Sequence, residues 1–377
     1  MMLYHLSSLL FLICQAQCLY SSTDAWQYPI RSPSYAFASS RVKKERCRPK
    51  VFPLRSSAPT NTDIDESLFA TLQRLGVRGI VSPSDGQEEG VVVQTTNKSV
   101  AGRGAFFVSP DATNTIQRGD VLARIPKTSL LTLSNPHSLS TSDDNEASKI
   151  RQDLLSLSHK SSWPVSFTLF TGMVASKKIF SEWIESFMGP EPPCLPTEDD
   201  VQNLMKMANV SKVTAEEASN FKYAAFTRDW NMAKEWMEGT DNNDIMTESQ
   251  FAKLYSILVS RTANLGPYYN NTRGVIPLHD MINHPPPDVE HSIELFTVGD
   301  LKELVPGDMI QQLMNRFVHK DNDESVLHLD DRDVLLVARR EIRPGEELFL
   351  SYRNNRAKPM EEKERAWTAL QYGFLVQ

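Results

Sequence analysis

Cysteine is scarce in this chain of 377 residues, which contains Cys14, Cys18, Cys47 and Cys194. A disulfide framework is not expected, because the first two cysteines lie in an N-terminal segment with the features of a removable signal. No CxxC pair or Cys/His cluster has the spacing of a zinc site. The sequence therefore predicts neither a disulfide-rich protein nor a structural metal.

Positive charge is lacking over most of the chain. Residues 1–60 hold eight Lys or Arg against Asp24 and Glu45, a balance of +6, so the total of −7 leaves −13 for residues 61–377. Phosphate binding needs clustered Lys and Arg, so an acidic body argues against a nucleic-acid partner. Apolar residues make up 40% of the chain, which is enough to bury a core.

The first apolar run, LSSLLFLI at 6–13, is too short to span a bilayer. The CQAQC that follows has the small residues of a signal-peptidase site, although a positive n-region is missing. Residues 19–62 are rich in Ser, Arg, Lys and Pro. A signal-like segment at 1–18 and a transit-like segment at 19–62 resemble a two-part plastid presequence. A fortuitous apolar start and a solvated, disordered tail remain the alternatives, with the secretory pathway or cytoplasm as the location.

Hydrophobic spacing divides the rest into three portions. Residues 63–145 open with a helix, in which three leucines stand at helical spacing before Gly76, and continue as strands. Residues 146–259 have helical spacing, with Thr197 as one N-cap. In residues 260–377 strand signals return, and a last helix precedes the end. The predicted strands are 90–96, 105–108, 120–125, 274–278, 292–298, 326–329, 333–342 and 347–352.

Short motifs follow one another in a fixed order. They are AGRGAFF at 101–107, SR at 260–261, PLHDMINH at 277–284, GEELFLSY at 345–352 and YGF at 372–374. The glycine pair alone is a weak signal, but DMINH, GEEL-x-x-SY and YGF in this order are specific. The pattern resembles the SET-domain protein methyltransferases, in the branch of the Rubisco large-subunit lysine methyltransferase, over roughly residues 63–377. The resemblance implies an α+β, SET-type fold of short strands and small sheets, split by a helical insertion.

The chain departs from that branch in several places. Arg353 follows the SY pair where relatives usually have glycine, residues 285–292 lack an expected asparagine, and residues 300–325 resemble an extra insertion. The C-terminal helical domain with which relatives hold a protein substrate is also not expected. These differences favour one alternative function, a catalytically inactive SET-like module that binds a protein.

The resemblance implies an enzyme that transfers methyl from S-adenosylmethionine (AdoMet) to a lysine of a protein substrate. Such a displacement depends on positioning the amine in line with the donor methyl. An ordinary lysine, with a pKa of about 10.4, must first lose its proton. By resemblance, Tyr352 is the catalytic residue that orients the amine. Histidine methylation occurs in the same wider family and remains an alternative.

The resemblance also implies a cofactor site. Asn283 would hydrogen-bond the amino-acid end of AdoMet, the backbone at His284 would contact the adenine, and Arg261 would pair with the carboxylate. Gly102 and Gly104 would let the backbone approach the cofactor closely. The predicted cofactor-binding set is completed by Arg103, Asp280, Tyr352 and Phe374.

Each of these residues also has a simpler structural interpretation. Tyr352 could be a half-buried core aromatic, Asn283 and Asp280 could cap a turn, and Arg261 could form a surface ion pair. The histidines of HDMINH stand five positions apart, unlike the HExxH arrangement, so the sequence predicts no metal site. The expected partner is a protein substrate, and the oligomeric state stays open.

Overall fold

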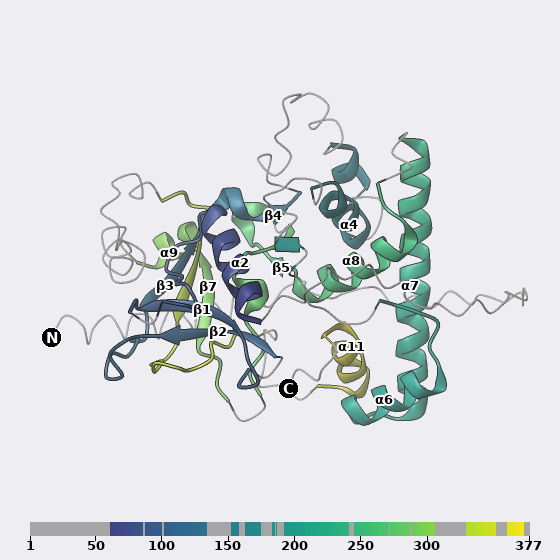
Figure 1. The fold of residues 1–377 in the computed structure, drawn as a ribbon. Helices are drawn as coiled ribbons and strands as arrows, with labels where there is room; N and C mark the ends of the chain where they lie inside the picture. Colours follow the sequence, from purple (N-terminus) through teal and green to yellow (C-terminus); the bar gives the residue numbers. More distant parts are fainter. Residues whose placement is uncertain are drawn as a thin grey trace, which may run out of the picture.

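A computed structural model gives the structure of the chain, with a β-rich body beside a helical portion (Figure 1). The predicted signal segment, nearly all of the transit-like segment, and Tyr352, Arg353 and Phe374 lie outside the residues that it describes. The described residues are 61–85, 87–99, 102–133, 152–157, 163–174, 183–184, 186, 192–240, 245–270, 272–286, 289–305, 329–351 and 360–372.

The first helix of the described chain is α2 (Asn61–Arg74). It buries the three leucines of the predicted helical stripe, Leu68, Leu72 and Leu75. Gly76 follows with a φ of 79°, a left-handed conformation that glycine adopts without strain. The helix and its stop are therefore confirmed as the sequence predicts them.

A two-stranded sheet packs against α2. Strand β1 (Gly90–Thr95) pairs antiparallel with β2 (Arg103–Val108). The buried carboxylate of Asp65 accepts hydrogen bonds from the amide and hydroxyl of Thr95, at 2.7 and 2.8 Å, and so ties the helix to the first strand. β-branched and aromatic residues fill both strands, as expected for a buried pleated surface.

The central sheet has the order β3 (Val121–Ile125), β8 (Val334–Ala338), β7 (Ile293–Thr297), all antiparallel. Every residue of β8 is buried, which explains its unbroken apolar run VLLVA. Arg124 donates to Asp333 from Nε at 3.0 Å and from Nη2 at 2.7 Å, joining the two chain segments that pair in this sheet.

A third sheet, of very short strands, connects the body to the insertion. Its order is β4 (Leu131–Thr132), β6 (Arg273–Val275), β5 (Ala263–Asn264). The 3₁₀ turns η1 (Lys127–Ser129), η3 (Pro267–Tyr269) and η4 (His279–Met281) lie close to it along the chain. The strand predicted at 274–278 thus ends early, because the chain enters the η4 turn.

The predicted strand at 347–352 and its hairpin are wrong. Residues 347–350 form single bridges to Phe106, Asn283 and Ile293, three segments far apart in sequence. The turn itself exists, since Glu346 N donates to Arg343 O at 3.1 Å and Gly345 has a φ of 82°. The strand before it pairs with β3 and β7 instead, as the middle strand of the central sheet.

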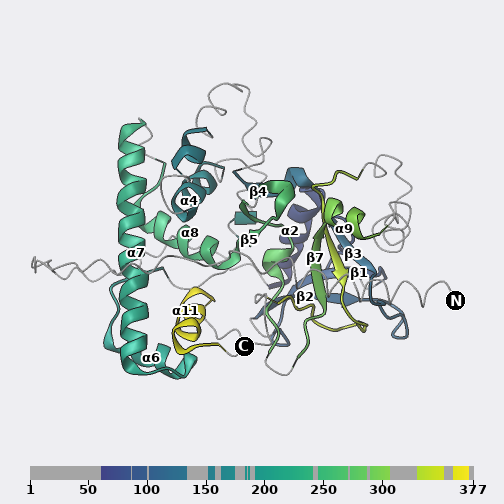
Figure 2. The same ribbon diagram turned by 180° about the vertical axis from the view of Figure 1, so that it is seen from behind.

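The helical insertion contains the long helix α7, which is separated from the sheets by shorter helices (Figures 1 and 2). Thr197 caps α6, accepting a hydrogen bond from Asp200 N at 3.2 Å, so the predicted N-cap is confirmed. One apolar cluster runs from α2 through the sheets to α4, α7 and α8, so body and insertion share a core. The helices are α4 (Trp163–Val174), α6 (Glu198–Ala208), α7 (Lys212–Gly239), α8 (Glu248–Arg261), α9 (Val298–Leu304) and α11 (Glu362–Tyr372).

The C-terminal helix α11 belongs to the insertion in space, although it follows the last sheet in sequence. It packs against α6, α7 and α8. The guanidinium of Arg365 donates to Ala208 O at 3.0 Å and Asn209 O at 2.8 Å, satisfying carbonyls at the end of α6. Among the described helices, none has both the length and the hydropathy needed to cross a membrane.

Candidate functional site

The DMINH motif follows a strained turn. Strand β6 leads into the buried Leu278, which has φ 70° and ψ −47°, a conformation that a bulky residue rarely adopts. Met281 N donates to Leu278 O at 3.0 Å and so closes the η4 turn. Strain of this kind is found where a site needs a fixed backbone. The turn carries His279 and Asp280 into the interior, where both are buried.

Three charged side chains from distant segments lie close enough to this turn to affect one another electrostatically: Arg103 from β2, Arg261 from the end of α8, and Asp280. Each affects the ionisation of another. Burial lowers the pKa of Arg103, Asp65 opposes that effect, and the nearby charge of Arg261 lowers it further. Two cations and the carboxylate of Asp280 therefore influence one another in a partly buried space, and the carboxylate of Asp65 also acts on Arg103.

Asp280 is the acid of this cluster. Burial raises its pKa to about 6, against the opposing effects of Arg261, of the Trp183 indole and of Arg103. The indole Nε1 of Trp183 donates to Oδ2 at 3.3 Å, whereas the buried Oδ1 has no hydrogen-bond partner among the described residues. An unmet acceptor of this kind costs free energy, which a bound donor would recover.

His279 adds a neutral group to the cluster. Burial lowers its pKa to about 4, and the charge of Arg261 lowers it further. The imidazole is therefore uncharged near neutral pH, and its buried Nδ1 has no hydrogen-bond partner within the described part of the chain. His279 does not cancel the charge of Asp280 or add to that of the arginines.

Asn283 occupies the centre of a second, hydrogen-bonded cluster. Its Nδ2 donates to Arg103 O at 2.7 Å, to Glu347 Oε1 at 2.8 Å and to Ser99 Oγ at 3.1 Å. Ser99 Oγ donates in turn to the same Glu347 oxygen, at 2.8 Å. The reverse amide orientation would set an oxygen against a carbonyl and a carboxylate, so these contacts fix it. The remaining Oδ1 accepts no hydrogen bond within the described chain.

The two glycines of the AGRG motif serve different purposes. A Cβ at Gly104 would lie 2.3 Å from Glu347 Oε1 and 2.8 Å from Ser99 Oγ. The Asn283 cluster therefore accounts for this glycine without any close approach of a cofactor. Gly102 has open space around its missing Cβ but a φ of 80°, so the turn conformation accounts for it.

The structure thus brings together most of the predicted cofactor-site residues. Arg103, Arg261 and Asp280 form the charged cluster, and Asn283 and Gly104 belong to the hydrogen-bonded one. His284 is buried next to Asn283 in sequence. Predictions for Tyr352 and Phe374 fall outside the described residues. No group of three His, Cys, Asp or Glu side chains that could hold a metal occurs in the described parts.

Sequence reasoning missed three residues of the site. Glu347 is buried, which its place in the GEEL motif could have suggested, because it directly precedes the apolar run Leu348–Leu350 and a buried charge needs a partner. Ser99 and Trp183 gave no signal, since each acts through a contact across 97 or more positions of the chain. Only the folded arrangement identifies them.

Comparison with known proteins establishes the fold. No family model and no curated protein matches the chain. Among solved structures, the SET domain of LSMT bound to lysine and AdoHcy matches with a TM-score of 0.51 and 16% identity, over 84% of this chain and 58% of that one. The same domain bound to MeLysine and AdoHcy gives 0.49 and 14%, over 85% and 57%. Rubisco LSMT bound to AdoMet gives 0.47 and 14%, over 83% and 56%.

The protein therefore has an α+β fold of the SET type, as its motifs predict. Within that class, the fold is similar to that of the SET domain of LSMT. The chain spans about 58% of the length of that relative. At this level of identity the likeness concerns the fold, and activity has to be argued from the site.

Proposed function

We propose that the protein is an AdoMet-dependent methyltransferase that modifies a lysine side chain of a protein substrate. The observation that carries this proposal is the charged cluster of Arg103, Arg261 and Asp280, which lies at the DMINH turn of a SET-type fold. The structures that share the fold are described as bound to AdoHcy or AdoMet, and to lysine.

The cluster fits the amino-acid end of AdoMet, which carries a carboxylate and an ammonium. The ligand carboxylate would accept fork-shaped hydrogen bonds from the guanidinium groups of Arg103 and Arg261. The ligand ammonium would donate to the unsatisfied Oδ1 of Asp280. Asn283 could contribute only through Oδ1, because Nδ2 already contacts three acceptors.

Bound AdoMet would supply an electrophilic methyl group on its sulfonium. The chain would supply alignment, which accounts for much of the rate enhancement in reactions of this type. The segment that leads to Tyr352 is held in place, because Leu350 N donates to Asn283 O at 3.0 Å. In this proposal the phenol of Tyr352 orients a neutral lysine amine, whose proton has been lost to water before transfer.

Calorimetric titration of AdoMet into the purified full-length protein tests the cofactor assignment without a substrate. We expect micromolar binding, weakened about tenfold in Arg261→Ala because one charge-assisted contact is lost. Arg343→Ala is the matched control, since the Arg343 side chain is exposed and lies far along the chain from the cluster. Absence of binding by a protein that unfolds cooperatively would reject the proposal in favour of the inactive module.

Methyl transfer itself is tested with radiolabelled AdoMet and proteins of a cell extract. Wild-type protein should label an acceptor protein at lysine, identified by mass spectrometry of the labelled peptide. Tyr352→Phe should bind AdoMet normally but lose most of this labelling. Labelling at histidine would show that the acceptor is histidine and not lysine, with the rest of the proposed mechanism unchanged. If Tyr352→Phe labelled the acceptor as strongly as the wild-type protein, Tyr352 would not be the catalytic residue.

A further inference from the structure

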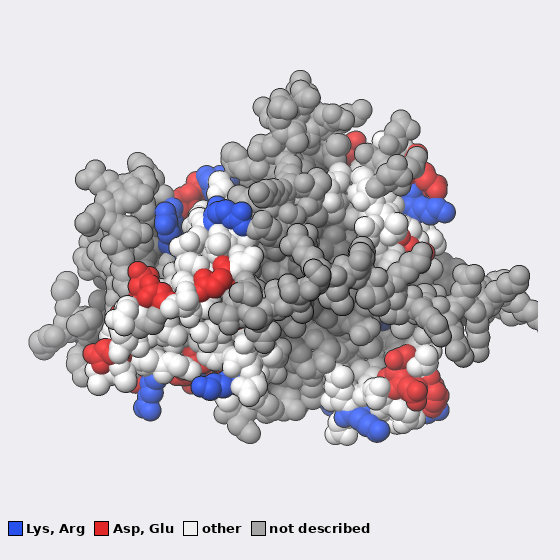
Figure 3. Space-filling view, viewed as in Figure 1, with Lys and Arg blue, Asp and Glu red and all other residues white. Residues whose placement is uncertain are grey.

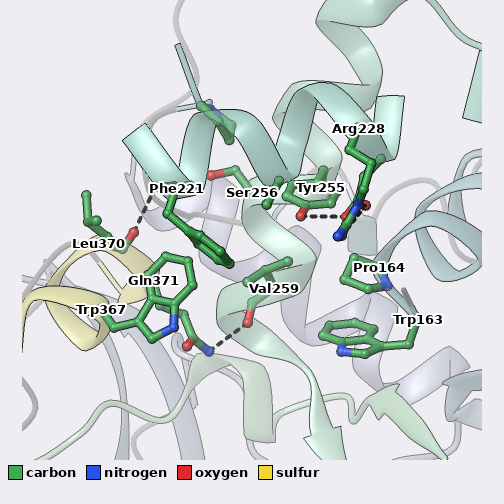
Figure 4. Close-up of a pocket in the computed structure, with 14 residues that line it drawn as sticks. Trp163, Pro164, Phe221, Arg228, Tyr255, Ser256, Val259, Trp367, Leu370 and Gln371 are labelled. Carbon is green, nitrogen blue, oxygen red and sulfur yellow. Dashed lines mark hydrogen bonds and ion pairs between the residues drawn. The ribbon is translucent and has the colours of Figure 1, made fainter. Parts of the chain in front are cut away.

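A second pocket lies in the helical insertion, between α4, α7, α8 and α11. Its volume is about 120 Å³. A cavity of roughly 150 Å³ accepts a whole benzene ring. This pocket is somewhat smaller and is bordered by exposed side chains, so it can take most of one bulky apolar side chain. Figure 4 shows Phe221 and Trp367 on one side of the space and Trp163 with Pro164 on the other. None of these residues belongs to the charged cluster described above.

Two large aromatic side chains stand exposed at this pocket. Phe221 is 56% exposed and Trp367 39%, and their rings meet edge to face at 5.3 Å. They come from α7 and α11, helices that are distant in sequence. Exposed apolar patches that line a hollow are characteristic of interaction sites, and tryptophan is enriched among residues that dominate binding energies.

The charge of the lining selects among ligands. Lys222 donates to Leu370 O at 2.8 Å, and burial lowers its pKa. Asp229 is buried and accepts from Arg228 at 2.7 Å and from the Tyr255 hydroxyl at 3.0 Å. The lining therefore carries two cations, Lys222 and Arg228, and one carboxylate, Asp229, which is already bonded to protein donors. This net positive charge disfavours a cationic ligand and favours an anionic group.

The net positive charge of the pocket lining contrasts with the acidic protein around it. The protein as a whole has a charge of −7. Acidic side chains gather over the first turn of the neighbouring helix α6, visible at the lower right of Figure 3. Those acids would repel a negative ligand from α6 itself, whereas Lys222 and Arg228 attract it into the pocket.

Helix α8 links this pocket to the candidate cofactor site. Tyr255, Ser256 and Val259 line the pocket, and the helix ends at Arg261 in the charged cluster. Two residues of helix rise by roughly 3 Å, so the separation along α8 between Val259 and Arg261 is short. Gln371 of α11 donates to Val259 O at 3.0 Å and holds the two helices together there.

We propose that this pocket binds the protein substrate, by accepting one bulky apolar side chain that is flanked in the substrate by an acidic residue. The aromatic lining takes the apolar group, and Lys222 and Arg228 face the acid. This assignment rests on the proposed methyltransferase function for its biological meaning, but the binding itself does not depend on AdoMet. It names a specificity site in the insertion, separate from the residues that hold the cofactor.

Three synthetic pentapeptides test the proposal on the full-length protein: Gly-Glu-Phe-Glu-Gly, the same peptide with Lys for Glu, and the same with Ala for Phe. Binding is followed by ligand-detected NMR titration. We expect the acidic phenylalanine peptide to bind at least about tenfold more tightly than either of the others. Equal binding of the acidic and basic peptides would overturn the charge argument. Equal binding of the alanine peptide and the phenylalanine peptide would show that the pocket does not accept the apolar side chain.

Variants locate the binding. Trp367→Ala and Phe221→Ala should each weaken binding of the acidic phenylalanine peptide about tenfold, and Lys222→Met should reduce its preference over the basic peptide. Val213→Ala is the matched control, because Val213 is an exposed apolar residue of α7 outside the pocket. Unchanged binding in both aromatic variants would overturn the assignment.

Calorimetry with AdoMet on the same proteins separates this proposal from the previous one. Pocket variants that lose peptide binding and keep AdoMet binding would support both. If the wild-type protein binds the peptide through the pocket but does not bind AdoMet, the pocket proposal stands and the methyltransferase proposal fails, and the protein is a binding module. A wild type that binds AdoMet but does not discriminate among the peptides would retain the enzyme assignment and overturn this one.

Discussion

The β-rich body and the helical insertion are stabilised by polar contacts of different range. In the body, Ser99 bonds to Glu347 across 248 positions and Arg124 to Asp333 across 209. In the insertion, the caps of α6 and α8 join residues three positions apart. The candidate cofactor site therefore depends on closure of distant segments, whereas the N-termini of α6 and α8 are capped by residues of their own first turn.

This difference has a functional consequence. Removal of one side chain from the Asn283 cluster leaves buried donors on several segments without an acceptor, so stability and site geometry should change together. Loss of the α6 cap should lower stability without any change at the cofactor site, because the apolar contacts of α6 with α7 and α11 still hold the helix. Such an arrangement would let the insertion vary while the candidate cofactor site stays fixed.

Replacement of Glu347 tests the comparison most severely. Glu347→Ala removes the acceptor that the Ser99 hydroxyl and the Asn283 amide share. The amide keeps Arg103 O as an acceptor, whereas a buried donor that is left unmet costs about 1–3 kcal/mol. We expect the free energy of unfolding to fall by about 3 kcal/mol and AdoMet binding to weaken strongly. Urea unfolding and calorimetry measure the two effects.

The neighbouring glutamate is the control for this experiment. Glu346 pairs with Arg340 in a half-exposed ion pair, which contributes less than about 1 kcal/mol. Glu346→Ala should therefore leave AdoMet binding unchanged. Glu347→Gln keeps an acceptor oxygen and should recover part of the loss. Equal effects of the two alanine variants would show that the Asn283 cluster does not support the site.

Gly104→Ala should have the second largest effect. The new Cβ would overlap the Glu347 carboxylate and the Ser99 hydroxyl, and overpacking of this kind costs about 1–3 kcal/mol. A double-mutant cycle with Glu347→Ala should show a combined loss smaller than the sum, because removal of the carboxylate makes room. Additive losses would refute the steric explanation.

Gly102→Ala should cost about 1 kcal/mol through its left-handed φ, and should show no such coupling with Glu347→Ala.

Much of the fold follows from the sequence because its elements are locally specified. The leucines of α2, the Thr197 cap and the VLLVA run of β8 each identify their element without any tertiary contact. The strand predicted at 347–352 failed for the opposite reason. Its apolar run Leu348–Leu350 is buried, but its bridges go to three different segments instead of one partner strand.

The candidate site was predictable only in part. The motifs identify Arg103, Arg261 and Asp280, and the fold places them together. They do not indicate that the Asn283 nitrogen is held by Ser99 and Glu347, because those contacts depend on segments that meet only after folding. The predicted role of Asn283 toward a cofactor therefore has to be restricted to its oxygen.

Asp280 makes a pH-dependent prediction of intermediate size. Its pKa is about 6 in the folded protein against an ordinary 3.8, so between these pH values the folded state holds a proton that the unfolded state has released. Its contribution to the free energy of unfolding should fall as pH rises through this window, and Asp280→Asn should lack that slope.

An ammonium ligand needs the ionised form of Asp280. AdoMet affinity should therefore weaken about tenfold per pH unit below pH 6, and the asparagine variant should show a flat profile.

Loss of the Thr197 cap should have the smallest effect and should stay within the insertion. Thr197→Ala removes the acceptor for Asp200 N and should lower the free energy of unfolding by about 1 kcal/mol. AdoMet affinity should not change, because no polar contact of α6 reaches the charged cluster among the described residues. Thr197→Ser retains the hydroxyl and should restore stability. A fall in AdoMet affinity with Thr197→Ala, measured on fully folded protein, would show that the insertion and the cofactor site are energetically coupled, contrary to the division between local and long-range support.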